Sequence, residues 1–128
     1  MPVRDQESRT GSQDLSVAID LIQTVTGDTF RKQVIEADHP VAVEFMSYGC
    51  AHCRAIEPAL QRIAEIDNSE VVLCRVNTAV DPNLASSFEI HGTPTLIMFL
   101  NGAEVGRVVG PSPTVSSVQA AMQEAFAQ

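Results

Sequence analysis

Phe45-Met-Ser-Tyr-Gly-Cys50-Ala-His-Cys53-Arg-Ala-Ile-Glu-Pro58 is the segment around which the rest of the chain is arranged. The apolar run that leads into it, Val41 to Met46, predicts a buried strand, and an apolar pattern of helical period begins at Cys50. The two cysteines therefore lie in the first turn of a helix, close enough to join as a disulfide. The helix N-terminus offers free N–H groups and the positive end of its dipole, which favour a thiolate. Because the thiolate is the reactive form of cysteine, the segment predicts a redox centre.

Composition narrows the class of protein. The chain has 128 residues, of which 45% are hydrophobic and 19% charged, which is ordinary for one globular domain. Its net charge of −8 and its scattered Lys and Arg residues argue against a nucleic-acid surface. No apolar run approaches the roughly 18 residues of a membrane span, so neither nucleic acid nor membrane is expected as a partner.

The number of cysteines indicates a redox environment. Three cysteines are too few for the disulfide framework of a secreted domain, and the odd count suits a reducing compartment in which one pair cycles. Residues 1–20 contain acidic residues and no apolar core of a secretory signal. The expected compartment is the cytoplasm.

The order of periodic segments predicts one α/β domain over residues 21–128, preceded by a mobile tail over residues 1–20 with a helical turn from Asp14. Strands are expected over residues 21–25, 41–46, 71–76, 95–100 and 103–109, with a hairpin turn at Asn101-Gly102. Helices are expected after an N-cap at Asp28, from Cys50 to about Asp67 with a bend at Pro58, after Pro82, and from Val115 to Ala125. This order predicts a central mixed β-sheet with helices on both faces.

Several motifs at fixed offsets together resemble the thioredoxin family over about residues 21–128. They are Val43-Glu-Phe, Cys50-Ala-His-Cys53, Pro58 five residues after the second cysteine, Gly92-Thr-Pro94 before an apolar strand, Asn101-Gly102, and Gly110 after the last strand. A CxxC pair alone is a weak signal, whereas the combination is specific. The resemblance implies the thioredoxin fold and a thiol–disulfide oxidoreductase that needs no cofactor or metal beyond its own disulfide.

The resemblance also assigns roles to residues. It implies that Cys50 is the attacking nucleophile and Cys53 the resolving thiol, and that Pro94 is a cis-proline beside them. Glu44 stands where the family has a buried aspartate, which makes it the candidate base for Cys53, unless it is a glutamate on a half-exposed strand. The other residues expected to contact substrate or support the site are Tyr48, Gly49, Ala51, His52, Thr93, Arg75, His91 and Gly110. The implied partners are protein disulfides or dithiols and a reductase or other thiol electron donor.

The chain departs from the family pattern in two ways. It contains no Trp: Gly49 precedes the nucleophile and Met46 takes another position where Trp is usual, so partner surfaces are expected to differ. A histidine, His52, precedes the second cysteine, as in more oxidising disulfide catalysts of the same fold. Because a protonated or hydrogen-bonding histidine stabilises the Cys50 thiolate, we expect a less reducing couple than in a typical thioredoxin.

Other interpretations compete for individual residues. The cysteine pair also suits a zinc or iron–sulfur site, but only Cys74 and three histidines remain as further ligands of those types. A structural disulfide is less expected in a reducing compartment. Cys74, in an apolar strand, is expected to be a buried structural thiol.

Polar and aromatic residues near the motifs are open to more than one interpretation. Arg75 either pairs with Glu44 or ends in solvent, His91 either borders the site or is a solvated loop residue, and Tyr48 either walls the site or only forms a turn. At the level of the whole domain, the alternative function is that of a binding or assembly module whose cysteines are spectators.

Overall fold

The computed structural model describes residues 19–66 and 70–127. The tail and the helical turn expected from Asp14 fall largely outside these residues. In chain order the elements are β2 (Gln23–Thr24), η1 (Arg31–Ile35), β3 (Val41–Met46), α3 (Ala51–Ile66), β4 (Val72–Asn77), α4 (Pro82–Ser87), β5 (Thr95–Leu100), β6 (Ala103–Val109) and α5 (Val115–Phe126).

The five strands form one mixed sheet in the order β2-β4-β3-β5-β6. β3 lies at its centre and is buried along its whole length. It runs parallel to β4, with Glu44 opposite Arg75, and antiparallel to β5, with Glu44 opposite Leu96. β5 and β6 form the hairpin expected at Asn101-Gly102. The central position of β3 explains its nearly unbroken apolar sequence, since both of its faces are covered.

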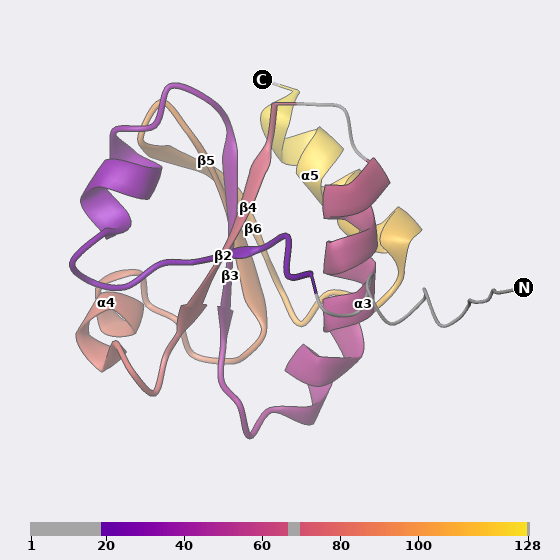
Figure 1. Cartoon of the computed structure of the whole chain (residues 1–128), viewed down its shortest axis with the longest axis horizontal. Coiled ribbons are helices and arrows are strands. Elements are labelled where there is room, and N and C mark those ends of the chain that lie inside the picture. The colour runs from indigo at the N-terminus through magenta and orange to yellow at the C-terminus, as the bar shows by residue number, and fades with distance from the viewer. Residues whose placement is uncertain (1–18, 67–69, 128) are drawn as a thin grey trace, which may run out of the picture.

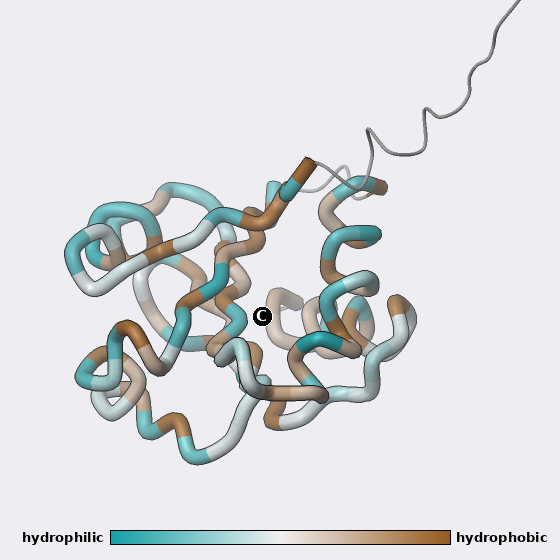
Figure 2. The backbone as a smooth tube through the Cα atoms, turned by 60° about the horizontal axis from the view of Figure 1, so that its bottom comes forward, coloured by the Kyte–Doolittle hydropathy of each residue, from teal (hydrophilic) through white to brown (hydrophobic). Residues whose placement is uncertain are grey.

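Helices cover both faces of the sheet (Figure 1). α3 and α5 lie together on one face, and η1 and α4 lie on the other. Along the helical turns the hydropathy colouring alternates between brown and teal (Figure 2), as expected for helices with one buried side.

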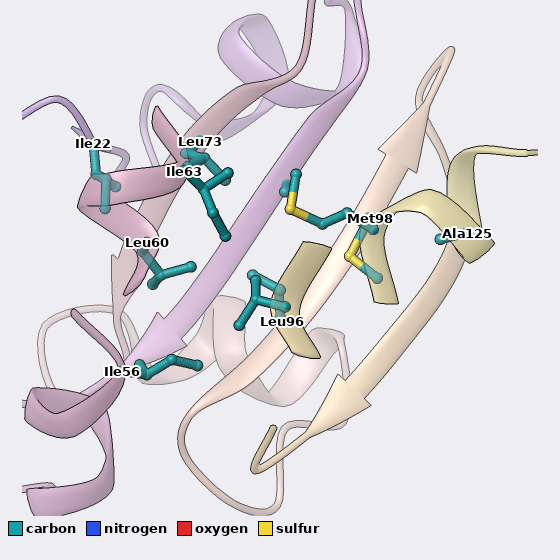
Figure 3. Packing of buried hydrophobic residues seen from close by; sticks show 11 residues of the cluster. Ile22, Ile56, Leu60, Ile63, Leu73, Leu96, Met98 and Ala125 are labelled. Atoms are coloured by element: carbon teal, nitrogen blue, oxygen red, sulfur yellow. The ribbon is translucent and has the colours of Figure 1, made fainter. Parts of the chain in front are cut away.

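Alternation along β3 divides the core into two clusters. Ala42 faces α3 and α5, whose buried side chains include Leu60, Ile63 and Ala125, and these point toward Leu96 and Met98 of β5 (Figure 3). Val41, Val43 and Phe45 face the opposite cluster. In that cluster the rings of Phe30, Phe88 and Phe99 pack with centroids 5.3 to 5.8 Å apart.

Two expected elements differ in detail. The first strand is reduced to Gln23–Thr24, and the expected helix after Asp28 is a five-residue π-helix, Arg31–Ile35. Asp28 does not cap it: the residue before the π-helix is Phe30, and no side chain caps its N-terminus. Instead, the Thr29 hydroxyl accepts a hydrogen bond from the N–H of Thr26, which forms a local turn before the helix starts.

The long helix begins one residue later than expected. α3 starts at Ala51, and the carbonyl of Cys50 accepts the first helical hydrogen bond, from the N–H of Arg54 at 3.2 Å. Cys50 is therefore the boundary residue between loop and helix. Pro58 lies inside α3, and the bend expected there stays a prediction.

Candidate active site

Cys50 and Cys53 form a disulfide at the start of α3, with Cα atoms 5.2 Å apart. This separation is typical of disulfides. Cys50 is partly exposed, whereas Cys53 is 3% exposed. The backbone N–H of Cys53 donates a hydrogen bond to Sγ of Cys50 at 3.1 Å. One sulfur is thus open to an incoming partner and held by a helix N–H, and the other is sheltered behind it.

The loop before β5 lies against the disulfide. Sγ of Cys50 is 3.4 Å from the carbonyl oxygen of Thr93, and the Thr93–Pro94 peptide bond is cis. Gly110, at a φ of 59°, donates its N–H to the carbonyl of Pro94 at 2.8 Å. A glycine suits this position because the left-handed backbone conformation is strained for other residues. The loops at Pro94 and Gly110 therefore form one wall beside Cys50.

His52 joins α3 to this wall. Its Nε2 lies 3.0 Å from the carbonyl oxygen of Pro111. Because a carbonyl only accepts hydrogen bonds, Nε2 carries the proton in this contact. A Cβ on Gly110 would lie 3.6 Å from the His52 ring, so the ring packs along this loop. The hydrogen bond of His52 goes to Pro111 rather than to Cys50, so any effect on the thiolate acts through space.

Glu44 is buried, at 2% exposed, on the central strand. Within residues 19–66 and 70–127, neither of its carboxylate oxygens has a hydrogen-bond partner. Burial is the main reason that its pKa is raised from 4.5 to about 7, with the charge of Glu57 adding to the rise and the charge of Arg75 opposing it. The half-exposed interpretation of Glu44 is therefore wrong. A carboxyl group that changes protonation near neutral pH suits a proton acceptor.

Arg75 lies opposite Glu44 on the neighbouring strand, but its guanidinium bonds to other carboxylates. Its side chain is 14% exposed, and it forms ion pairs with Asp20 and Glu57. Among the described residues it forms no ion pair with Glu44, although its charge acts on that carboxyl group. The interpretation of Arg75 as a residue that ends in solvent is wrong. Bonds from Arg75, Gln61 and the backbone hold the pKa of Asp20 well below its usual range.

The remaining expected residues lie around the rim. Tyr48 is 77% exposed, and its carbonyl accepts a hydrogen bond from Nη1 of Arg54 at 2.9 Å. Gly49 and Ala51 are exposed on either side of Cys50. His91 is exposed, and in the part of the chain that the structure describes it makes no hydrogen bond with the other site residues.

A pocket of about 290 Å³ opens next to Cys53. The residues that line it come from the loop before α3, from α3 itself and from the sheet, and they are Thr24, Met46, Ser47, Tyr48, Cys53, Arg54, Glu57, Arg75 and Asn77. Met46, at a position where the resemblance led us to expect Trp, is one of these lining residues. The pocket places Cys53 beside Glu57 and Arg75.

Two residues of this region were missed from the sequence, Glu57 and Asp20. Glu57 had a signal, since it follows Cys53 by four residues and so shares its face of α3. Asp20 had none, because its partners Gln61 and Arg75 lie 41 and 55 residues away along the chain.

Cys74 is buried as expected, at 1% exposed. It lies in the core cluster that packs against η1 and α4, on the opposite face of the sheet from α3. Burial raises the pKa of its thiol to about 11. It is a free cysteine.

Among residues 19–66 and 70–127, no three His, Cys, Asp or Glu side chains gather as a metal site would require. Within the same residues, no helix combines the length and the apolar character that crossing a membrane demands.

Comparison with known proteins extends these observations. A family model described as Thioredoxin matches residues 21–124. Thioredoxin 1 of Nostoc sp. is 36% identical over 95 residues, which cover 74% of this chain and 89% of that protein. Thioredoxin 1 of Synechococcus elongatus is 38% identical over 89 residues, covering 70% and 83% of the two chains. A crystal structure of Malassezia sympodialis thioredoxin (Mala s 13) superimposes with a TM-score of 0.71 at 27% identity, covering 80% of this chain and 89% of that one. The fold expected from the sequence is confirmed.

Proposed function

This chain belongs to the thioredoxin family and is a thiol–disulfide oxidoreductase, and from that premise we propose how its residues divide the reaction. The observation that carries the proposal is the asymmetry of the disulfide. Cys50 is partly exposed at the helix start, and Cys53 is buried behind it. This arrangement supports Cys50 as nucleophile and Cys53 as resolving thiol.

In the reduced protein, the Cys50 thiolate attacks one sulfur of a partner disulfide. A Cys50–partner disulfide forms, the partner's own S–S bond breaks, and one partner sulfur leaves as a thiolate. The N–H of Cys53, which donates to Sγ of Cys50, supports the thiolate before the attack.

Cys53 then loses its proton to Glu44, directly or through water, and attacks Sγ of Cys50. The Cys50–Cys53 bond forms, the bond to the partner breaks, and the second partner sulfur leaves as a thiolate. The burial of Glu44 and its titration near pH 7 support this role, because such a carboxylate accepts a proton more readily than an exposed one. A reductase or another thiol donor returns the disulfide to the dithiol, and no further cofactor takes part.

The partner is proposed to bind as an extended segment along Thr93 and Pro94, beside the exposed residues Tyr48, Gly49 and Ala51. The short distance between Thr93 and Sγ of Cys50 supports this placement, because a segment paired with the Thr93 backbone would carry its cysteine next to Cys50. The proposed setting is a reducing compartment such as the cytoplasm, since the third cysteine is free.

The division of roles is tested by disulfide reduction of insulin with the parent, Cys50→Ser and Cys53→Ser. We expect Cys50→Ser to reduce the rate to that of the chemical reductant alone. Cys53→Ser is expected to accumulate a mixed disulfide with the substrate, visible by non-reducing electrophoresis. Unchanged activity in Cys50→Ser would instead support a binding or assembly module whose cysteines are spectators.

We also propose a couple less reducing than the roughly −270 mV of thioredoxin. The reason is His52 in the first turn of α3, whose positive form favours the Cys50 thiolate and hence the reduced state. Each ~1.4 kcal/mol of such stabilisation raises the potential by about 30 mV. Redox titration against glutathione measures this, with His52→Ala expected to lower the potential. A parent potential as low as that of thioredoxin would contradict the proposal.

A further inference from the structure

The guanidinium of Arg75 is held between two carboxylates on the side of the sheet that α3 covers. Its Nη1 lies 2.6 Å from Oδ2 of Asp20, and its Nη2 bonds to Oε2 of Glu57. The side chain of Glu57 is 32% exposed and that of Asp20 is 53% exposed. Arg75 therefore has two anionic partners, and both are more exposed than Glu44.

Glu44 is next to this cluster but receives no hydrogen bond from it. It is opposite Arg75 in the register of β3 and β4, yet both of its buried oxygens lack a hydrogen-bond partner in the described part of the chain. The other packed elements do not compensate its charge: β5 places Leu96 opposite it, and α3 contributes the like charge of Glu57. Arg75, whose positive charge acts on Glu44, is already bound by Asp20 and Glu57.

We propose that Glu57 is a positioning residue for the proton acceptor: it binds Arg75 and adds a second negative charge near Glu44, so that Glu44 keeps the ability to take a proton from Cys53 at neutral pH. The inference rests on the proposed role of Glu44. Glu57 and Cys53 line the same pocket, four residues apart on one face of α3, so Glu57 lies on the same side of the helix as the thiol that gives up the proton.

The electrostatics agree with this geometry. After burial, the charge of Glu57 is the next cause of the raised pKa of Glu44, and the charge of Arg75 acts in the opposite direction. Removing the negative charge of Glu57 takes away one like charge near Glu44. It also leaves the positive charge of Arg75 less neutralised, so that Arg75 acts more strongly on Glu44. Both effects make the Glu44 carboxylate easier to form, and a more easily formed carboxylate is a weaker base.

The test follows the titration of Glu44 by carboxyl carbon NMR in the oxidised protein, in which Cys50 and Cys53 are joined and do not titrate. Glu57→Gln is expected to move the midpoint to lower pH by about half a unit or more, since a like charge nearby is lost. Glu65→Gln is the matched control, because it makes the same charge change on α3 at a residue paired with Arg62. Glu57→Asp keeps the charge and is expected to retain a midpoint near that of the parent.

A midpoint that moves no further in Glu57→Gln than in Glu65→Gln would overturn the inference. Should Glu57→Gln fail to fold, the Glu44 midpoint is compared between Glu57→Asp and Glu57→Lys, which differ in the sign of the charge at this position. Activity provides the second readout, through the pH profile for release of the reduced partner from the mixed disulfide. We expect this profile to shift with Glu57→Gln in the parent and to be unaffected by it in a Glu44→Gln background.

Two outcomes separate this inference from the proposed function. If Glu44→Gln leaves the release rate unchanged while Glu57→Gln still moves the Glu44 midpoint, the role of Glu44 as base fails and the electrostatic role of Glu57 stands. If Glu44→Gln slows release but Glu57→Gln leaves the midpoint in place, the base stands and the inference about Glu57 fails.

Discussion

Among single residues, Glu44 combines burial with a raised pKa. A carboxylate buried on a central strand without a hydrogen-bond partner is disfavoured, so the folded protein prefers the neutral acid. The pKa of this group rises from 4.5 to about 7 on folding. Between these two values the folded chain binds more protons at Glu44 than the unfolded chain does. Folding stability from this group is therefore full below about pH 4.5, falls as pH rises to about 7, and is level above it.

The first prediction concerns this pH dependence. Glu44→Gln is expected to remove it, because an amide does not ionise. At pH 8 the variant is expected to exceed the stability of the parent by up to about 3 kcal/mol, and at pH 4.5 to match the parent within about 1 kcal/mol. Urea unfolding of the oxidised proteins, followed by circular dichroism at both pH values, measures the difference. A gap of equal size at both pH values would show that ionisation of Glu44 is not the cause.

At the scale of elements, the close packing of α5 against β6 depends on a residue without a side chain. A Cβ built on Gly106 would lie 2.7 Å from Cβ of Ala125. Real Cβ atoms do not approach so closely, and Ala125 is itself 5% exposed in the core. A larger residue at either position therefore pushes the helix away from the sheet.

The second prediction follows from this contact. Gly106→Ala is expected to destabilise the protein by about 1–3 kcal/mol through overpacking, measured by thermal or urea unfolding. Gly49→Ala is the control, since a Cβ there meets no atom within 4 Å, and we expect its effect to stay within about 0.5 kcal/mol. Equal effects of the two substitutions would mean that contact with α5 does not decide the result.

The elements also show how far sequence reasoning extends. Periodicity located β3, β5 and α3 to within about a residue, because each buries a long regular face. It failed where local side-chain chemistry competes with the helix. The Thr26–Thr29 hydrogen bond and the absence of a cap from Asp28 leave only a short π-helix at Arg31–Ile35.

The site also contains residues that the sequence predicts and residues that it does not. The positions of Cys50, Cys53 and Glu44 follow from motifs that lie within ten residues of one another. The partners of Arg75 do not, because pairing with Asp20 depends on how the segment before β2 returns to α3. An offset in the sequence places a residue on an element, whereas an ion pair between elements is decided by packing.

In the molecule as a whole, the sheet separates the disulfide of Cys50 and Cys53 from the free thiol of Cys74. Cys50 and Cys53 lie at the start of α3, and Cys74 is in the core cluster beneath η1 and α4. With 1% of its surface exposed and a pKa raised to about 11, Cys74 has little thiolate and no access to a reagent. Disulfide exchange between Cys74 and the active-site pair is therefore blocked while the sheet is intact.

The third prediction is a count of reactive thiols. In the native oxidised protein we expect iodoacetamide to modify no cysteine, and in the native reduced protein to modify Cys50 alone, because Cys53 and Cys74 are buried. Cys74 is expected to react only in denaturant. Mass spectrometry of the alkylated chain measures the number, with Cys74→Ala as the control that removes the third addition. Modification of Cys74 at the rate of Cys50 in native buffer would contradict this placement.

The burial of Cys74 also provides a way to measure how fast the folded protein opens. In the oxidised chain Cys74 is the single free thiol. The rate at which a thiol reagent modifies it therefore reports how often the core around it opens. The chain has no tryptophan to serve as a fluorescent reporter, so modification of Cys74 gives a direct measure of the opening rate.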